Sequence, residues 1–148
     1  MNNASLVIAD ADALIAFANP DDIHHHRARL VSQSLDQQGI AILFPTTAII
    51  EAVTTLQRKL TKPQIAAFIV DEVKEGTIAI QEVDQDTLIQ AVGLFHPLGS
   101  KQNTLFDAVV AALAKRLNAD AIFSFDEWYR KIGLTLTDDL IAETKHAA

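Results

Sequence analysis

The sequence predicts an α/β fold built on a mostly parallel sheet of about five strands, with helices on both of its faces. Short apolar runs alternate with longer segments of helical pattern along the chain, and strands separated by helices usually pair in parallel. The runs are continuous rather than alternating in polarity, which is typical of strands buried on both faces. Aliphatic residues dominate and aromatic residues are few, a composition that suits helices packed on an aliphatic sheet.

The first expected strand is an uninterrupted apolar run that ends at Asp10. Pro45 ends the second strand, and Gly76 separates the third from the helix before it. The expected strands are residues 6–9, 40–44, 78–80, 121–123 and 134–136. In sheets of this kind the functional crevice lies at the carboxyl ends of the strands, so that edge is where we expect a site.

The segments between these strands carry helix start and stop signals. Asn19-Pro20 closes the first helix, Gly39 ends the second, and Pro63 suits the first turn of a later one. Asn103 or Thr104 is expected to cap a strongly apolar helix. The expected helices are residues 11–18, 21–38, 46–60, 61–75, 84–95, 105–117 and 127–131, and residues 138–148 are expected to form a terminal helix or a frayed tail.

Length and composition limit the possible classes of protein. A chain of 148 residues fits one domain, expected to span residues 1–148. The absence of cysteine excludes disulfides and thiolate zinc sites, and it fits a reducing, cytoplasmic location. No signal peptide or membrane-spanning run is evident in the sequence. A net charge of −7 argues against a passive nucleic-acid binder but not against a nuclease that holds a divalent cation.

Four acidic residues stand where a site would form. Asp10 and Asp126 follow the first and fourth expected strands, so both belong to the same edge of the sheet. Asp107 and Glu51 lie on helices among apolar or small neighbours, where an uncompensated carboxylate is costly to bury. Each acid also has a structural interpretation: Asp10 or Asp12 and Asp126 could cap helices, Asp107 lies in a favourable first turn, and Glu51 could be solvated.

Convergence of these acids at one edge predicts a metal site. Carboxylates that lie close together need a cation between them or raised pKa values. All-oxygen ligation suits Mg²⁺ or Mn²⁺, which would leave positions open for a phosphate and a water molecule. The chemistry indicated is phosphodiester hydrolysis by metal-activated water.

Three segments resemble the PIN-domain family, and most closely the VapC-type ribonuclease toxins of toxin–antitoxin systems. They are VIADADALIAF at residues 7–17, TTAIIEAVTTLQRKL at 46–60 and NTLFDAVVAALAKRLNADAIFSFDEWYRKIGL at 103–134. The third segment is the most specific, because its helix with an aspartate, its turn, its strand and its Ser-Phe-Asp all match. The first segment alone would be a weak signal.

The resemblance implies a three-layer α/β/α sandwich and a metal-dependent endoribonuclease. It implies that Asp10, Glu51, Asp107 and Asp126 are the catalytic, metal-binding acids. It also implies a homodimer and a protein antitoxin as partner. Supporting residues beside these acids are Asp12, Ser124 and Thr47: Ser124 matches a small hydroxyl residue of the family, Asp12 stands where Asn, Ser or Thr is usual, and Thr47 lies one turn before Glu51.

Some residues have both a functional and a structural interpretation. Arg58, Lys59, Arg130 and Lys131 are candidate contacts to RNA phosphates, although basic residues at helix ends are also ordinary dipole partners. Trp128 and Tyr129 could stack on a base, and packing within the protein is the favoured interpretation. The three histidines at 24–26 favour a solvated helix start over a metal site, because consecutive helical residues point in different directions.

Three alternatives remain at this stage. Asp10-Ala11-Asp12 also suits a haloacid-dehalogenase-like phosphotransferase, with Ser124 and Asp138-Asp139 as later motifs, although that scheme leaves Glu51 and Asp107 without a role. The chain could instead be a PIN-like nuclease of RNA processing, or a PIN-like binding module without activity.

Overall fold

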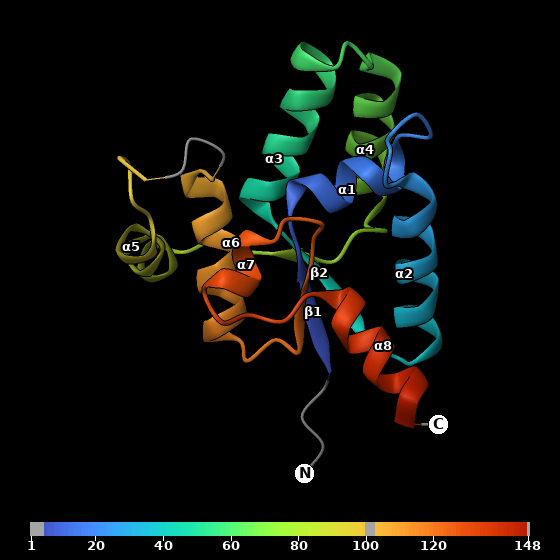
Figure 1. The fold of residues 1–148 in the computed structure, drawn as a ribbon. Coiled ribbons are helices and arrows are strands. Elements are labelled where there is room, and N and C mark those ends of the chain that lie inside the picture. The colour runs from blue at the N-terminus through green and yellow to red at the C-terminus, as the bar shows by residue number, and fades with distance from the viewer. Residues whose placement is uncertain (1–4, 100–102, 148) are drawn as a thin grey trace.

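A computed structural model describes residues 5–99 and 103–147 of the chain. Its described part contains a parallel sheet of four strands in the order β3-β2-β1-β4 (Figure 1). The strands are β1 Leu6–Ala9, β2 Ala41–Pro45, β3 Ile80–Gln81 and β4 Ala121–Phe123. The prediction of an α/β fold with a parallel sheet is confirmed.

The prediction of a fifth strand at 134–136 is wrong. Leu136 forms a single parallel bridge with Ile122, and the Ile122 N–H donates to the carbonyl of Thr135 at 2.8 Å. A helix begins at Thr137, directly after the bridge, so the chain leaves the sheet after one residue pair. Short apolar runs carry no signal that distinguishes one paired residue from a strand.

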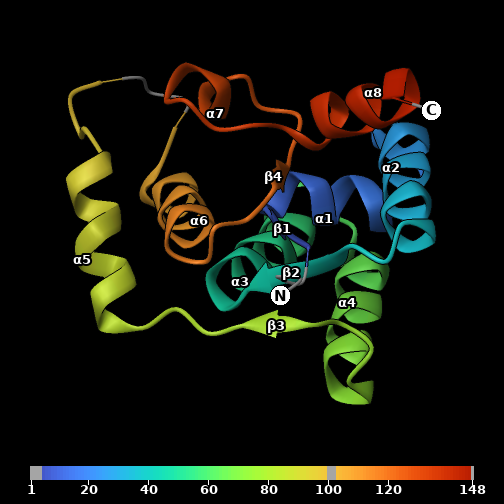
Figure 2. The same cartoon turned by 90° about the horizontal axis from the view of Figure 1, so that it is seen from below.

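Helices cover both faces of the sheet. They are α1 Ala11–Ala18, α2 His25–Gln37, α3 Thr46–Thr54, η1 Thr55–Lys59, α4 Pro63–Glu75, α5 Gln85–Leu94, α6 Leu105–Arg116, α7 Trp128–Lys131 and α8 Thr137–Ala147, of which η1 is a π-helical turn. In Figure 2, α5 and α6 lie on one side of the strands, and α2 and α8 lie on the other. No helix of the described residues is long and apolar enough to cross a membrane.

Strand β1 shows why both faces are buried. Its side chains alternate between faces. Ile8 packs in a core cluster with α5 and α6, whereas Val7 and Ala9 pack with α1, α2 and α8 on the opposite face. All three are fully buried. A third apolar cluster joins α1, α3 and α4, which stand together beyond one end of the sheet in Figure 1.

Two helices differ from the sequence prediction. Helix α2 begins at His25 rather than at Asp21, because residues 20–24 form turns in which Asp22 Oδ1 accepts from the His24 N–H at 2.8 Å. The helix expected at 46–60 stays helical but loosens at Thr55 into the π-helical turn η1.

The register of β1 and β4 sets the position of the site. Ala9 pairs with Phe123 in the parallel ladder, and the Asp10 N–H donates to the Phe123 carbonyl at 3.2 Å. Asp10 and Ser124 therefore leave the two central strands side by side, at the carboxyl edge that the sequence indicates.

Candidate active site

Asp10 is the most buried acid of the cluster, with 3% of its surface exposed. Its Oδ1 accepts from the Ala13 N–H at 3.0 Å and so caps α1, while its Oδ2 accepts from Ser124 Oγ at 2.5 Å and from Tyr129 Oη at 3.3 Å. Burial, and then the charge of Asp12, raise the pKa of Asp10 well above its ordinary value, although the donors oppose the shift. Asp10 is thus both a helix cap and a member of the cluster.

Ser124 connects two of the acids. It is buried, its hydroxyl donates to Asp10, and its Oγ accepts from the Asp126 N–H at 3.1 Å. This position beside Asp10 agrees with the supporting place expected for Ser124. Asp126 in turn begins the short segment that leads into α7, because its Oδ1 accepts from the Trp128 N–H at 2.9 Å.

Asp107 also combines two roles, because it caps a helix and is a member of the cluster. It is the third residue of α6 and forms a capping box with Thr104, whose N–H donates to Asp107 Oδ2 at 3.0 Å. Its Oδ1 lies 3.4 Å from Tyr129 Oη, which donates toward it. Burial, followed by the charges of Asp126 and Asp12, raises the pKa of Asp107 against the lowering effect of its hydrogen bonds.

Glu51 reaches the cluster from α3. Its side chain is partly buried, and burial, followed by the charges of Asp107 and Asp12, raises its pKa to about 7. Thr47 lies one helical turn earlier, and its Oγ1 is a buried polar atom without a hydrogen-bond partner. An unpartnered buried hydroxyl is costly, so a polar ligand beside Glu51 would relieve it.

Asp12 stands at the open side of the cluster. Its side chain is exposed, yet burial of part of the carboxylate, followed by the charges of Asp126 and Asp22, raises its pKa. His24 and Lys59 act in the opposite direction. The structure therefore places Asp12 within the field of the other acids, whereas Asp10 is the residue that caps α1.

Two uncharged side chains hold the acids together, and the sequence alone did not assign them this role. Asn103 Nδ2 donates to Asp126 Oδ2 at 3.0 Å and lies 3.5 Å from Asp107 Oδ2. Tyr129 is fully buried and places its hydroxyl between Asp10 and Asp107. The four-residue spacing of Asn103 and Asp107 was a usable signal for the first contact, but no pattern in the sequence points to the second.

The packing interpretation of the aromatic pair is confirmed for Tyr129. Its ring is buried and meets the Trp128 ring edge to face, with centroids 5.2 Å apart. A buried ring is not free to stack on a nucleobase.

The basic residues predicted to contact RNA differ in whether they form ion pairs within the protein. Arg130 is engaged, because it forms ion pairs with Glu127 and with Asp139. Arg58, Lys59 and Lys131 form no ion pair within the described residues, and Lys59 lines a pocket beside Asp12.

In the dehalogenase-like alternative, one of the two later motifs is engaged elsewhere. Asp138 and Asp139 form ion pairs with Arg27 and Arg130 respectively. That scheme also leaves Glu51 and Asp107 without a role. These two acids lie close enough for the charge of Asp107 to raise the pKa of Glu51.

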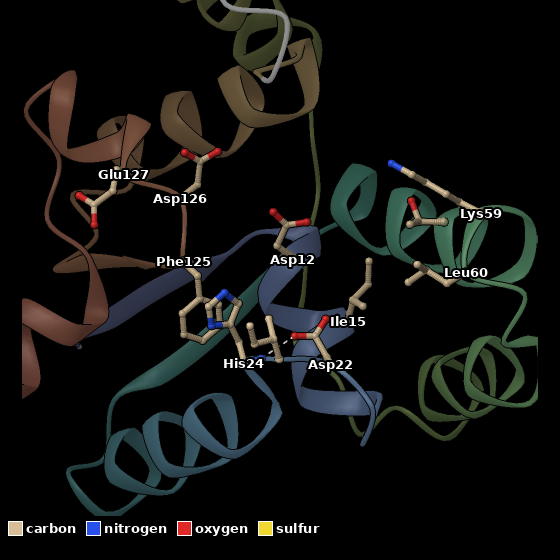
Figure 3. A pocket seen from close by; sticks show the side chains of 11 residues that line it. Asp12, Ile15, Asp22, His24, Lys59, Leu60, Phe125, Asp126 and Glu127 are labelled. Carbon is tan, nitrogen blue, oxygen red and sulfur yellow. Dashed lines mark hydrogen bonds between the residues drawn. The ribbon is translucent and has the colours of Figure 1, made fainter.

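A pocket of about 570 Å³ opens next to the cluster (Figure 3). We call it the side pocket, and its lining residues are Asp12, Ile15, Asp22, Ile23, His24, Thr55, Lys59, Leu60, Phe125, Asp126 and Glu127. In Figure 3 the Asp12 and Asp126 carboxylates lie at one end of it, above the rings of His24 and Phe125. Two members of the acidic cluster therefore border this cavity.

The acids form an all-oxygen donor set of the kind that hard divalent cations prefer. Within residues 5–99 and 103–147, however, no group of three or more His, Cys, Asp or Glu side chains has the geometry of a metal site. Several of the acid oxygens are occupied instead by hydrogen bonds from Ser124, Tyr129, Asn103 and the capped backbone.

A family model of the PIN domain matches residues 7–134, a stretch that includes every acid of the cluster. The chain belongs to the PIN-domain family. Among solved structures, the Mycobacterium tuberculosis toxin VapC20, described as cleaving the sarcin–ricin loop, superposes with a TM-score of 0.75 and 17% identity, covering 88% of this chain and 97% of that one.

VapBC2 from Rickettsia felis, bound to a DNA fragment from its promoter, superposes with a TM-score of 0.62 and 14% identity, covering 88% of this chain and 96% of the other. At these identities the similarity establishes a shared fold, which confirms the expected PIN-like α/β architecture. No curated protein sequence matches the chain.

Proposed function

We propose that this protein is a divalent-metal-dependent endoribonuclease and the toxin of a toxin–antitoxin pair. The observation that carries the proposal is the meeting of Asp10, Glu51, Asp107 and Asp126 at the carboxyl edge of a PIN-domain sheet. The fold shared with a toxin described as cleaving the sarcin–ricin loop supports RNA as the substrate.

The same four acids would hold the metal ion, Mg²⁺ or Mn²⁺. Their donor chemistry fits such an ion, and the raised pKa values of Asp10, Glu51 and Asp107 reflect burial and mutual repulsion that a cation would relieve. The unpartnered Thr47 hydroxyl lies on the same helix as Glu51 and fits the same interpretation. A bound ion would supply charge stabilisation at the phosphate and a more acidic water.

The chain's own residues prepare this chemistry. Ser124 orients Asp10, and Asn103 joins Asp107 to Asp126 without adding charge. Lys59, at the rim of the side pocket, supplies a cation for an RNA phosphate.

The test is cleavage of a panel of structured RNAs by wild type and Asp107→Asn, with Mn²⁺ or Mg²⁺ and with EDTA. An asparagine at 107 can still accept the capping hydrogen bond, so the fold should persist while activity falls at least 100-fold. Asp71→Asn is the matched control, because Asp71 is an exposed acid on α4, outside the acidic cluster. Full activity in EDTA or in Asp107→Asn would contradict the mechanism.

The partner proposals are a protein antitoxin and a homodimer, in the cytoplasm. The fold shared with a VapBC complex supports an antitoxin. Light scattering should give a mass near twice the 16.1 kDa of one chain. Robust RNA cleavage without toxicity on expression would favour the RNA-processing nuclease, and no cleavage of any RNA would favour the inactive binding module.

A further inference from the structure

The side pocket contains a stacked pair of rings next to the acids. The His24 and Phe125 rings are nearly parallel, with an interplanar angle of 9° and centroids 4.4 Å apart (Figure 3). Phe125 is itself held edge to face by Phe123, at 6.2 Å. Because His24 is exposed and Phe125 covers only one face of its ring, the other face is available to a flat ligand.

The charge of the side pocket selects the kind of ligand. Asp12, Asp22, Asp126 and Glu127 line it, against the single cation of Lys59 among its lining residues. A phosphate would be repelled from most of this surface. A neutral, flat group with N–H donors suits it, because ionised carboxylates only accept hydrogen bonds.

Among nucleobases this lining favours those that carry an exocyclic amino group. Adenine, cytosine and guanine each present an amino donor that a carboxylate can accept. Uracil presents one N–H between two carbonyl oxygens, and those oxygens would face the carboxylates. The Asp12 side chain forms no hydrogen bond within the described residues, and the Asp22 side chain uses only Oδ1, which accepts from the His24 N–H.

Size and position agree with a nucleotide subsite. Ligand pockets commonly span roughly 300–1,000 Å³, and the 570 Å³ of the side pocket lies within that range. Asp126 and Asp12 border both the acidic cluster and this pocket, so a base bound here would belong to a nucleotide close to the phosphodiester at the acids.

We propose that the side pocket binds one unpaired, amino-bearing nucleobase of the RNA, stacked on His24, next to the bond that is cleaved. This inference rests on the proposed nuclease function, since it assigns a substrate subsite to the same edge of the molecule. Unpaired bases that stack on aromatic or histidine rings are the usual means of reading single-stranded RNA.

The test measures binding separately from cleavage. Single-stranded RNA octamers carry the fluorescent base 2-aminopurine at one position, moved stepwise along the strand, and bind the full-length protein with Ca²⁺ in place of Mg²⁺ or Mn²⁺. At one position we expect fluorescence quenching on binding. His24→Ala should abolish the quenching and weaken binding about tenfold, as expected for loss of one stacked base.

His24→Phe keeps a stacking ring and should retain the quenching, whereas His26→Ala, at an exposed neighbour that does not line the pocket, should behave as wild type. Octamers with uracil at the position where 2-aminopurine is quenched should compete at least fivefold more weakly than octamers with adenine there.

Two results separate this inference from the proposed function. Quenching that depends on His24, without cleavage of any RNA in Mn²⁺, would overturn the nuclease and keep the subsite. RNA cleavage by a protein whose binding shows no quenching, or equal quenching in His24→Ala, would overturn the subsite alone.

Discussion

Tyr129 places one hydroxyl between two carboxylates, Asp10 and Asp107, at 3.3 and 3.4 Å. A phenol has one proton, so it donates fully to one acid at a time. The hydroxyl keeps the two acids at a fixed spacing without contributing a charge, and the buried ring holds it in place.

Tyr129→Phe removes this hydroxyl and leaves the ring packing against Trp128 intact. We expect RNA cleavage to fall about fivefold through kcat, with a several-fold weaker Mn²⁺ affinity, because Asp10 and Asp107 lose their shared donor. Steady-state kinetics and titration calorimetry with Mn²⁺ measure the two effects. Trp128→Phe, which disturbs the same ring contact without touching the hydroxyl, is the control, and equal losses in both variants would assign Tyr129 a packing role only.

At the level of single residues, the sequence predicted the positions of the acids better than the positions of the side chains that contact them. Asp10 and Asp126 follow from where apolar runs end, because parallel strands bring their carboxyl ends together. The contacts of Tyr129, the hydrogen bond from Asn103 to Asp126 and the His24–Phe125 pair depend on how α6, α7 and the turn before α2 pack in three dimensions. No local pattern encodes those distances.

At the level of elements, the π-helical turn η1 matters for the site. It follows α3 without a break, and the Leu60 N–H donates to the Thr55 carbonyl at 2.9 Å, five residues back. A π-helical turn shifts the residues after it around the helix axis. Thr55 and Lys59, at the two ends of η1, both line the side pocket.

Lys59→Ala should therefore weaken RNA binding more than the loss of an exposed lysine of α4. We expect KM to rise about three- to tenfold with little change in kcat, and the slope of log Kd against log salt to fall by about 0.7, the value for one phosphate contact on a single strand. Lys74→Ala, at the exposed end of α4, is the matched control. An unchanged salt slope in Lys59→Ala would remove Lys59 from the RNA surface.

The differences in elements have local physical causes. The helix expected from 21 starts at His25 because the Asp22 side chain satisfies a backbone donor in a turn instead of capping a helix. The strand expected at 134–136 shrinks to one bridge because Thr137 starts α8 at once. In both places the start of a helix, at His25 and at Thr137, decides where the neighbouring segment ends.

At the level of the whole molecule, the acidic cluster makes stability depend on pH. The pKa values of Asp10, Asp12, Glu51 and Asp107 are raised in the folded protein. At these four residues the native state binds more protons than the unfolded chain, so the contribution of the cluster to stability is greatest below the ordinary pKa values near 4 and falls as pH rises through the folded values.

Metal-free protein should lose several degrees of Tm between pH 5.5 and pH 8, across the titration of Glu51 near 7. Glu51→Gln should raise stability at pH 8 by on the order of 1–2 kcal/mol, a discounted part of its pKa shift, and flatten the pH profile. Glu82→Gln, at an exposed acid outside the cluster, controls for the lost charge. Saturating Mn²⁺ should flatten the wild-type profile too, and a profile that rises with pH would contradict this account.

The fold as a whole was predictable because its signals repeat. Apolar runs at regular intervals specify strands, helical segments between them specify crossovers, and both agree with one parallel sheet. The single domain expected over residues 1–148 stays a prediction.

Asp10 and Asp107 each cap a helix with the same carboxyl group that they present to the cluster. The helix caps and the acidic cluster consequently share carboxyl groups, so removing a whole carboxyl group weakens both. Alanine at either position removes both contributions, whereas asparagine retains an oxygen for the cap, removes the charge and replaces the second oxygen with an NH2 group. Under the proposed nuclease function, the amide variants are therefore the forms expected to stay folded without activity, and those in which to capture intact RNA or a partner.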